Sequence, residues 1–182
     1  MTDPAAVYDV RISGLWNTRH AVFKDGQSLG VLALERRPTG VVQAASYKPE
    51  KGEVLSMRRD PGLLRSQFSL WTDGHEWLGS SLRWSLLRRE IVLHTGSKPL
   101  RILPVPGFAF GWTLVAPRTG EMARVVSSPF SRKATIEVFR KMDFELAIFT
   151  YFLGRQVLWE SLWPRPRLSS EVSFPAQPAA DA

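Results

Sequence analysis

The chain has 182 residues, which is enough for one domain of ordinary size with tails. It contains no cysteine, which excludes disulfides, thiolate metal sites and cysteine nucleophiles and fits a cytoplasmic protein. Its 24 Lys and Arg against 17 Asp and Glu give a net charge of +7, which favours anionic partners such as phospholipid head groups, acidic proteins or nucleic acid.

Residues 1–6 are expected to be disordered, and they lack the basic and apolar regions of a secretory signal. Residues 7–163 form the single predicted domain. Most of that domain consists of short alternating segments separated by turn residues, which is typical of a sandwich or barrel. The predicted strands are residues 8–12, 20–24, 28–35, 41–47, 53–57, 66–71, 75–85, 90–94, 100–103, 110–116, 121–126 and 134–140.

The strands contain an internal repeat. Asp25-Gly26 is followed by Leu29-Gly30, Asp73-Gly74 by Leu78-Gly79, and a weaker third copy surrounds Gly120. The three turn glycines lie 48 and 46 residues apart, a period that indicates three units of about four strands. In each strong copy, Asp-Gly is expected to make a tight turn and the Leu-Gly glycine to permit a bulge or a close backbone approach.

The segment Asp143–Trp163 is predicted to be a helix that is apolar on all sides, with Asp143 as its N-cap and Pro164 ending it. Its longest uncharged run is only nine residues, against about 20 for a membrane span, so no integral span is expected. A helix of this kind has to be surrounded by protein instead. Gly154 marks the position where a barrel strand or side chain is expected to approach it.

About twelve strands closed into a barrel leave a lumen wide enough for a helix of about 10–12 Å diameter. The chain is therefore predicted to be mainly β, with a closed barrel enclosing a C-terminal helix. Three repeats also suit a β-trefoil-like fold that binds carbohydrate or protein, and this is the alternative. Residues 164–182, which are rich in Pro and Ala, are expected to be a disordered tail.

The Asp-Gly hairpins, the Leu-Gly returns, the last strand Thr135–Phe139 and the helix start at Met142-Asp143 resemble the tubby-like superfamily. That superfamily comprises tubby proteins, phospholipid scramblases and LURP-one-related proteins, and the resemblance covers residues 7–163. It implies a twelve-stranded barrel around a hydrophobic C-terminal helix. It also implies binding to anionic membranes, including phosphoinositides, or to protein partners rather than catalysis.

Enzyme motifs such as a nucleophile elbow, a P-loop or a zinc-protease helix are absent, so a non-enzymatic protein without cofactor is expected. The three histidines lack metal-ligand spacing, and no metal site is predicted. Basic pairs at predicted strand ends are the candidate anion-binding residues, because Arg binds phosphate bidentately. These candidates are Arg36, Arg37, Arg58, Arg59, Arg88, Arg89, Arg140 and Lys141.

Adjacent residues on a strand point to opposite faces, so both members of a pair are expected to be exposed only if the pair lies in a loop. Loop placement is therefore predicted, and several loops on one rim would form a positive surface. The predicted function is recognition of anionic phospholipid head groups or of a phosphorylated or acidic partner, with peripheral membrane association. Nucleic-acid binding is a second alternative, and the sequence leaves the oligomeric state open.

Overall fold

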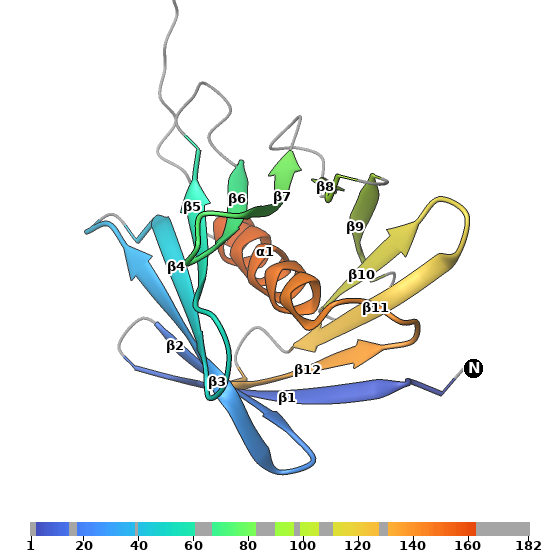
Figure 1. Cartoon of the computed structure of the whole chain (residues 1–182), viewed down its shortest axis with the longest axis horizontal. Helices are drawn as coiled ribbons and strands as arrows, with labels where there is room; N and C mark the ends of the chain where they lie inside the picture. Colours follow the sequence, from blue (N-terminus) through green and yellow to red (C-terminus); the bar gives the residue numbers. More distant parts are fainter. Residues whose placement is uncertain are drawn as a thin grey trace, which may run out of the picture.

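In the residues that the structure describes, twelve antiparallel strands form one closed barrel around a single helix (Figure 1). The computed structural model describes residues 3–14, 18–38, 40–60, 67–82, 90–96, 99–105, 111–127 and 131–162, with side chains up to residue 155. The strands are β1 (Ala6–Ser13), β2 (Arg19–Lys24), β3 (Gln27–Arg36), β4 (Val42–Pro49), β5 (Leu55–Arg59), β6 (Phe68–Thr72), β7 (Trp77–Leu82), β8 (Ile91–His94), β9 (Leu100–Pro104), β10 (Gly111–Ala116), β11 (Gly120–Ser127) and β12 (Lys133–Val138), and the helix is α1 (Phe144–Leu162).

Each strand pairs with its neighbours in the sequence, and β1 closes the barrel against β12. The barrel therefore has two different ends. We call the one where β12 stops and α1 begins the hairpin end, because the β2–β3, β6–β7 and β10–β11 turns lie there. We call the opposite one the arginine end, where β3 stops at Arg36 and β5 stops at Arg59.

The repeat expected from the sequence is confirmed by three equivalent β-bulges. The bulges follow the β2–β3, β6–β7 and β10–β11 turns. Each adds one residue to the strand after the turn, namely Leu29 in β3, Leu78 in β7 and Met122 in β11. All three side chains are partly buried and pack on the core. A regular bulge pattern around the wall bends the strands in the way that closure of a barrel requires.

The expected role of Gly30 is also confirmed. Its φ is +149°, and a Cβ there would lie 2.4 Å from the backbone oxygen of Lys48. The Asp25-Gly26 turn is tight, with positive φ at both residues, as expected. The second copy differs, because residues 73–76 form a longer loop in which His75, not Gly74, has positive φ.

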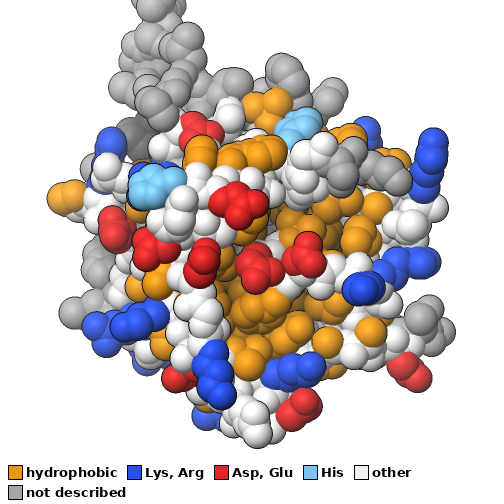
Figure 2. Space-filling model, viewed as in Figure 1, with side chains coloured by type: hydrophobic (Ala, Val, Ile, Leu, Met, Phe, Trp, Pro, Cys, Tyr) orange, Lys and Arg blue, Asp and Glu red, His pale blue; other side chains and the backbone are white. Residues whose placement is uncertain are grey.

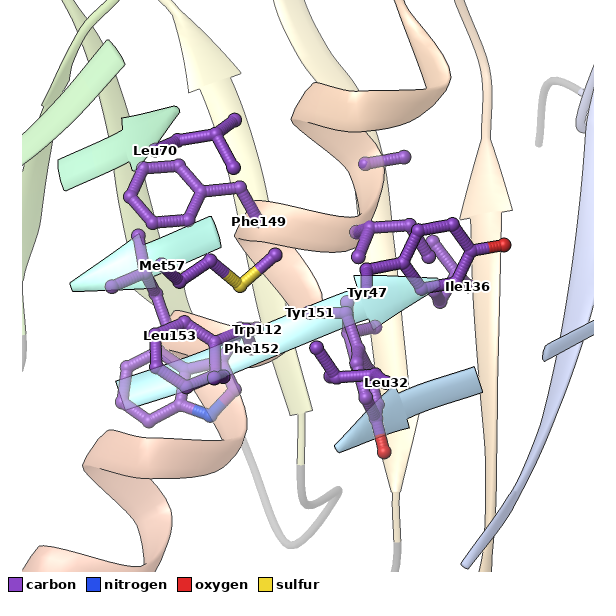
Figure 3. Close-up of a cluster of buried hydrophobic side chains, with 14 of the residues drawn as sticks. Leu32, Tyr47, Met57, Leu70, Trp112, Ile136, Phe149, Tyr151, Phe152 and Leu153 are labelled. Atoms are coloured by element: carbon purple, nitrogen blue, oxygen red, sulfur yellow. The ribbon is translucent and has the colours of Figure 1, made fainter. Parts of the chain in front are cut away.

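The helix is enclosed by the barrel, as predicted. The nine consecutive residues 147–155 are all buried, so every side of two and a half helical turns is covered. Figure 3 shows wall side chains such as Met57 and Leu70 pointing toward Phe149 on the helix. The ring of Phe152 meets Phe68 edge-on at 5.0 Å between centroids. The lumen is therefore a packed core and not a pore.

Gly154 is the point of close approach that the sequence predicted. A Cβ at this position would lie 2.7 Å from Cδ1 of Trp112, which is buried on β10. Of the other described tryptophan side chains, Trp71 is half-buried and Trp77 is exposed. Trp112 is therefore a core residue, and its contact sets how close α1 comes to the wall.

The single closed sheet is not the arrangement of a β-trefoil, so that alternative is not the observed fold. The helix bounds agree with the predicted ones within one residue. At the N-terminus, strand pairing reaches into the segment expected to be disordered, because Ala6 pairs with Val138 and the Ala5 amide donates to the Val138 carbonyl. Residues 164–182 lie outside the described residues.

Candidate functional site

The structure divides the predicted basic residues between the two ends of the barrel. Arg36, Arg37, Arg58 and Arg59 all lie at the arginine end, on the last residues of β3 and β5 or directly after them. Arg140 and Lys141 are exposed at the hairpin end, between β12 and α1. Arg88 and Arg89 lie outside the described residues. One rim therefore holds two of the four predicted pairs, and a third lies opposite.

The expected loop placement is wrong for three of these residues, because Arg36, Arg58 and Arg59 belong to strands. Successive side chains on a strand point alternately into the barrel and out of it. Arg36 follows the inward positions of β3 and Arg59 those of β5, and both are half-buried, whereas Arg37 and Arg58 are exposed. Each pair thus gives one guanidinium to the mouth of the lumen and one to the outer surface.

Arg36 is positioned by a β-bulge and a short turn. The bulge falls between Glu35 and Arg36, where β3 loses register with β4. Its Nη1 donates to the carbonyl oxygen of Gly40 at 2.9 Å, across the β3–β4 connection. Bulges commonly re-aim a side chain at a barrel rim. Here the bulge holds Arg36 beside a hollow of about 350 Å³ lined by Thr18, Arg36, Arg37, Pro38 and Gly40.

A further charged residue reaches the arginine end from inside. Arg155 on α1 is only 4% exposed, and its Nη1 donates to Oγ of Ser127 on β11 at 2.5 Å. One turn earlier on the helix, the hydroxyl of Tyr151 lies 2.6 Å from Nδ1 of His20 on β2. His20, Ser127, Tyr151 and Arg155 are therefore buried polar residues in a largely apolar lumen, which also holds Ser81 and Thr150.

Burial governs the electrostatics of this cluster. It lowers the pKa of Arg155, against a small opposing effect of Tyr151. Burial also lowers the pKa of Arg36, and the positive charge of Arg155 lowers it further, so the two guanidinium groups lie within electrostatic range. Burial raises the pKa of Tyr151, which keeps its hydroxyl neutral at physiological pH. The arginine end thus carries buried as well as exposed positive charge, and its acidic side chains include Glu35 and Asp60.

The hairpin end has a different chemistry. A hollow of about 320 Å³ there has an apolar lining that includes Tyr8, Tyr47 and Phe144, and charges of both signs lie around it, among them Lys51 and Glu145. On the face shown in Figure 2, acidic side chains lie across a hollow lined by hydrophobic side chains, and basic side chains lie toward the edges. Arg140 and Lys141 are therefore set apart from the arginine end in position.

Other site types find no support in the described part of the chain. No group of three His, Cys, Asp or Glu side chains there could hold a metal ion. No helix among these residues is long and apolar enough to cross a bilayer. The most informative residue of the arginine end, Arg155, is not among the predicted site residues. Its signal in the sequence is the one positive charge in a helix that is apolar on all sides.

Comparison with known proteins supports the architecture alone. No family model matches the chain, and a search of curated proteins finds no significant match. Among solved structures, the chain is similar to the X-ray structure of the AT5G01750 protein of Arabidopsis thaliana, with a TM-score of 0.54 and 12% identity. The match covers 89% of this chain and 94% of the plant protein. This likeness shows that the same barrel fold occurs in a solved structure.

Proposed function

We propose that this protein is a non-enzymatic, tubby-like binding module that docks peripherally on membranes by recognising anionic phospholipid head groups at its arginine end. The observation that carries the proposal is the gathering of Arg36, Arg37, Arg58 and Arg59 at one rim. The twelve-stranded barrel around a C-terminal helix supports the assignment to the tubby-like superfamily, including its LURP-one-related and scramblase-like members. A cytoplasmic location is part of the same proposal.

The surface of the arginine end suits this role. Arg37 and Val41 face one another across the β3–β4 turn, where the Arg37 amide donates to the Val41 carbonyl at 2.9 Å. The Val41 side chain is 38% exposed. An exposed apolar residue next to arginines pairs contact with the lipid interface and attraction to anionic head groups. Exposed Arg19 and Arg132 extend the positive charge of the rim.

Vesicle co-sedimentation tests the proposal. The protein is mixed with phosphatidylcholine vesicles that contain or lack phosphatidylserine or a phosphoinositide. We expect binding only to the anionic vesicles, weakened by salt. Each basic residue near an anionic surface contributes about 1 kcal/mol, so the double variant Arg37→Glu/Arg58→Glu should bind roughly tenfold more weakly or worse.

The matched control is Arg140→Glu/Lys141→Glu, which changes the net charge equally at the hairpin end. It should bind anionic vesicles nearly as well as the parent. Equal loss in both variants would mean that only net charge matters and would refute a docking surface at the arginine end. Binding to DNA or RNA in preference to vesicles would favour the nucleic-acid alternative, and no anion-dependent binding at all would remove the lipid role.

A further inference from the structure

Arg155 holds a positive charge in the interior of the barrel that no described residue neutralises. The residue is only 4% exposed, and among the described residues only its Nη1 has a partner, the Ser127 hydroxyl. Nε and Nη2 are buried and hydrogen-bond no group in the structure. Burial of an unpaired charge costs free energy. An arginine cannot avoid that cost by losing its proton, because the pKa of a guanidinium stays above physiological pH. A buried arginine therefore needs an anion.

The two unused nitrogens form one edge of the guanidinium plane, the edge that binds two oxygens of an oxyanion side by side. Arg124 of the same protein shows this geometry. Its Nε and Nη2 each donate to one carboxylate oxygen of Glu121, both at 2.8 Å. The Nε–Nη2 edge of Arg155 has the same donors but lacks such a pair of oxygens. The Nε–Nη2 edge of Arg155 could therefore bind a group with two or more acceptor oxygens.

The surroundings favour a phosphate over a singly charged carboxylate. Arg36 lies within electrostatic range of Arg155, and a second positive charge favours the anion with more negative charge. Arg36 also lines the open hollow of about 350 Å³ beside Thr18 and Gly40. Arg36 thus lines a hollow that is open to solvent and also lies within electrostatic range of the buried Arg155.

We propose that the inside of the arginine end is a binding site for a phosphate group, held by the Nε–Nη2 edge of Arg155 with Ser127 and Arg36 beside it. The phosphate can come from a free phosphate ester or from a lipid head group, because both present the same oxygens. This inference goes beyond vesicle docking, since a soluble phosphate can occupy the site with no membrane present.

The test measures thermal unfolding of the full chain in increasing inorganic phosphate, against sodium chloride of equal ionic strength and against acetate. A ligand that binds only the folded state raises the melting temperature with its concentration relative to its dissociation constant. We expect a rise with phosphate, a smaller rise with acetate and little with chloride. Equal effects of phosphate and chloride at matched ionic strength would overturn the proposal.

Arg155→Met tests the residue itself. The methionine keeps much of the length and apolar contact of the side chain but lacks the two donors Nε and Nη2. Losing charged hydrogen bonds should weaken phosphate binding by about ten- to hundredfold. In chloride alone this variant should melt no lower than the parent, because an uncompensated buried charge has been removed. Arg124→Met is the matched control: its edge is already occupied by Glu121, so the phosphate response should persist.

If Arg155→Met does not fold, Arg36→Met at the rim gives the second variant, and it should also weaken the phosphate response. An undiminished response in both variants would contradict the site. Soluble inositol phosphate and phosphoinositide vesicles distinguish the two sources, because only a lipid-specific site prefers the vesicles. The outcome is separate from the docking surface: Arg37→Glu/Arg58→Glu should lose vesicle binding and keep the response to inorganic phosphate.

Discussion

The middle of the barrel and its arginine end are made from the same strands and the same helix, yet they obey different rules. In the middle, Phe149, Phe152 and the inward wall residues fill the lumen with apolar side chains at full burial. Barely one helical turn further on, Arg155 and Ser127 place a charge and a hydroxyl at similar burial. Packing explains the first region, and packing alone does not explain the second. This difference is the basis for the anion site proposed at the arginine end.

Removing an apolar side chain from the middle should have the largest effect. Phe152→Ala would delete a ring that meets Phe68 at 5.0 Å and stacks on Phe149 at 6.4 Å. Truncating a buried phenylalanine costs about 3–5 kcal/mol, so the urea midpoint should fall sharply. A change below about 1 kcal/mol would mean that the helix is not packed inside the barrel, and the comparison would fail.

Gly154→Leu tests the border between the two regions. A side chain at this position would meet the Trp112 ring, since even its Cβ would lie 2.7 Å from that ring. Overpacking of this kind costs about 1–3 kcal/mol. Gly74→Leu on the hairpin loop is the control, because the nearest atom to its Cβ would be 3.6 Å away. Thermal melts should separate the two variants, and equal melting temperatures would contradict an enclosed helix.

Two buried tyrosines provide the finest comparison. The Tyr47 hydroxyl has no hydrogen-bond partner, whereas that of Tyr151 meets His20. Tyr47→Phe should therefore leave the free energy of unfolding unchanged or raise it, and Tyr151→Phe should lower it by about 0.5–1.5 kcal/mol at pH 7. Denaturant titrations measure both values. A larger loss in Tyr47→Phe than in Tyr151→Phe would contradict the hydrogen bond assigned to the Tyr151 hydroxyl.

The same tyrosines predict an alkaline limit of stability. Burial raises the pKa of both above the ordinary 10.0, and for Tyr47 the charges of Glu50 and Glu145 add to the rise. Their neutral forms therefore contribute fully below about pH 10. That contribution is lost as the pH rises further, because the unfolded chain then ionises while the folded chain resists. Either phenylalanine variant should lose stability less steeply above this pH.

Much of the fold could be predicted from local sequence. Alternation located the strands, the Asp-Gly turns located two hairpins, and the all-round apolar segment required an enclosing wall. The third repeat, around Gly120, is weak in sequence but carries the same bulge at Met122. This third bulge therefore occurs at the equivalent position of its hairpin although the turn before it has no Asp-Gly sequence. Turn detail was less predictable, because His75 takes the left-handed conformation beside Gly74.

The site was less predictable because it depends on residues far apart in the chain. Sequence located the arginine pairs near strand ends, but it could not decide whether Arg36 and Arg59 turn inward. That choice depends on the strand extending to its last residue and on the bulge beside Arg36. In the local sequence, Arg155 is only a charge that interrupts the apolar run of the helix. Its importance comes from Ser127, which lies 28 residues away in sequence, and from Arg36, which lies within electrostatic range.

The most direct measurement is an X-ray structure of crystals soaked in tungstate, a heavy tetrahedral oxyanion that reports its position by anomalous scattering. If the arginine end holds an anion inside the barrel, a peak should lie within hydrogen-bond distance of Nε and Nη2 of Arg155, beside Ser127. An Arg155 edge bound instead by a carboxylate of the chain, or with no tungstate beside it, would show that no anion site exists there.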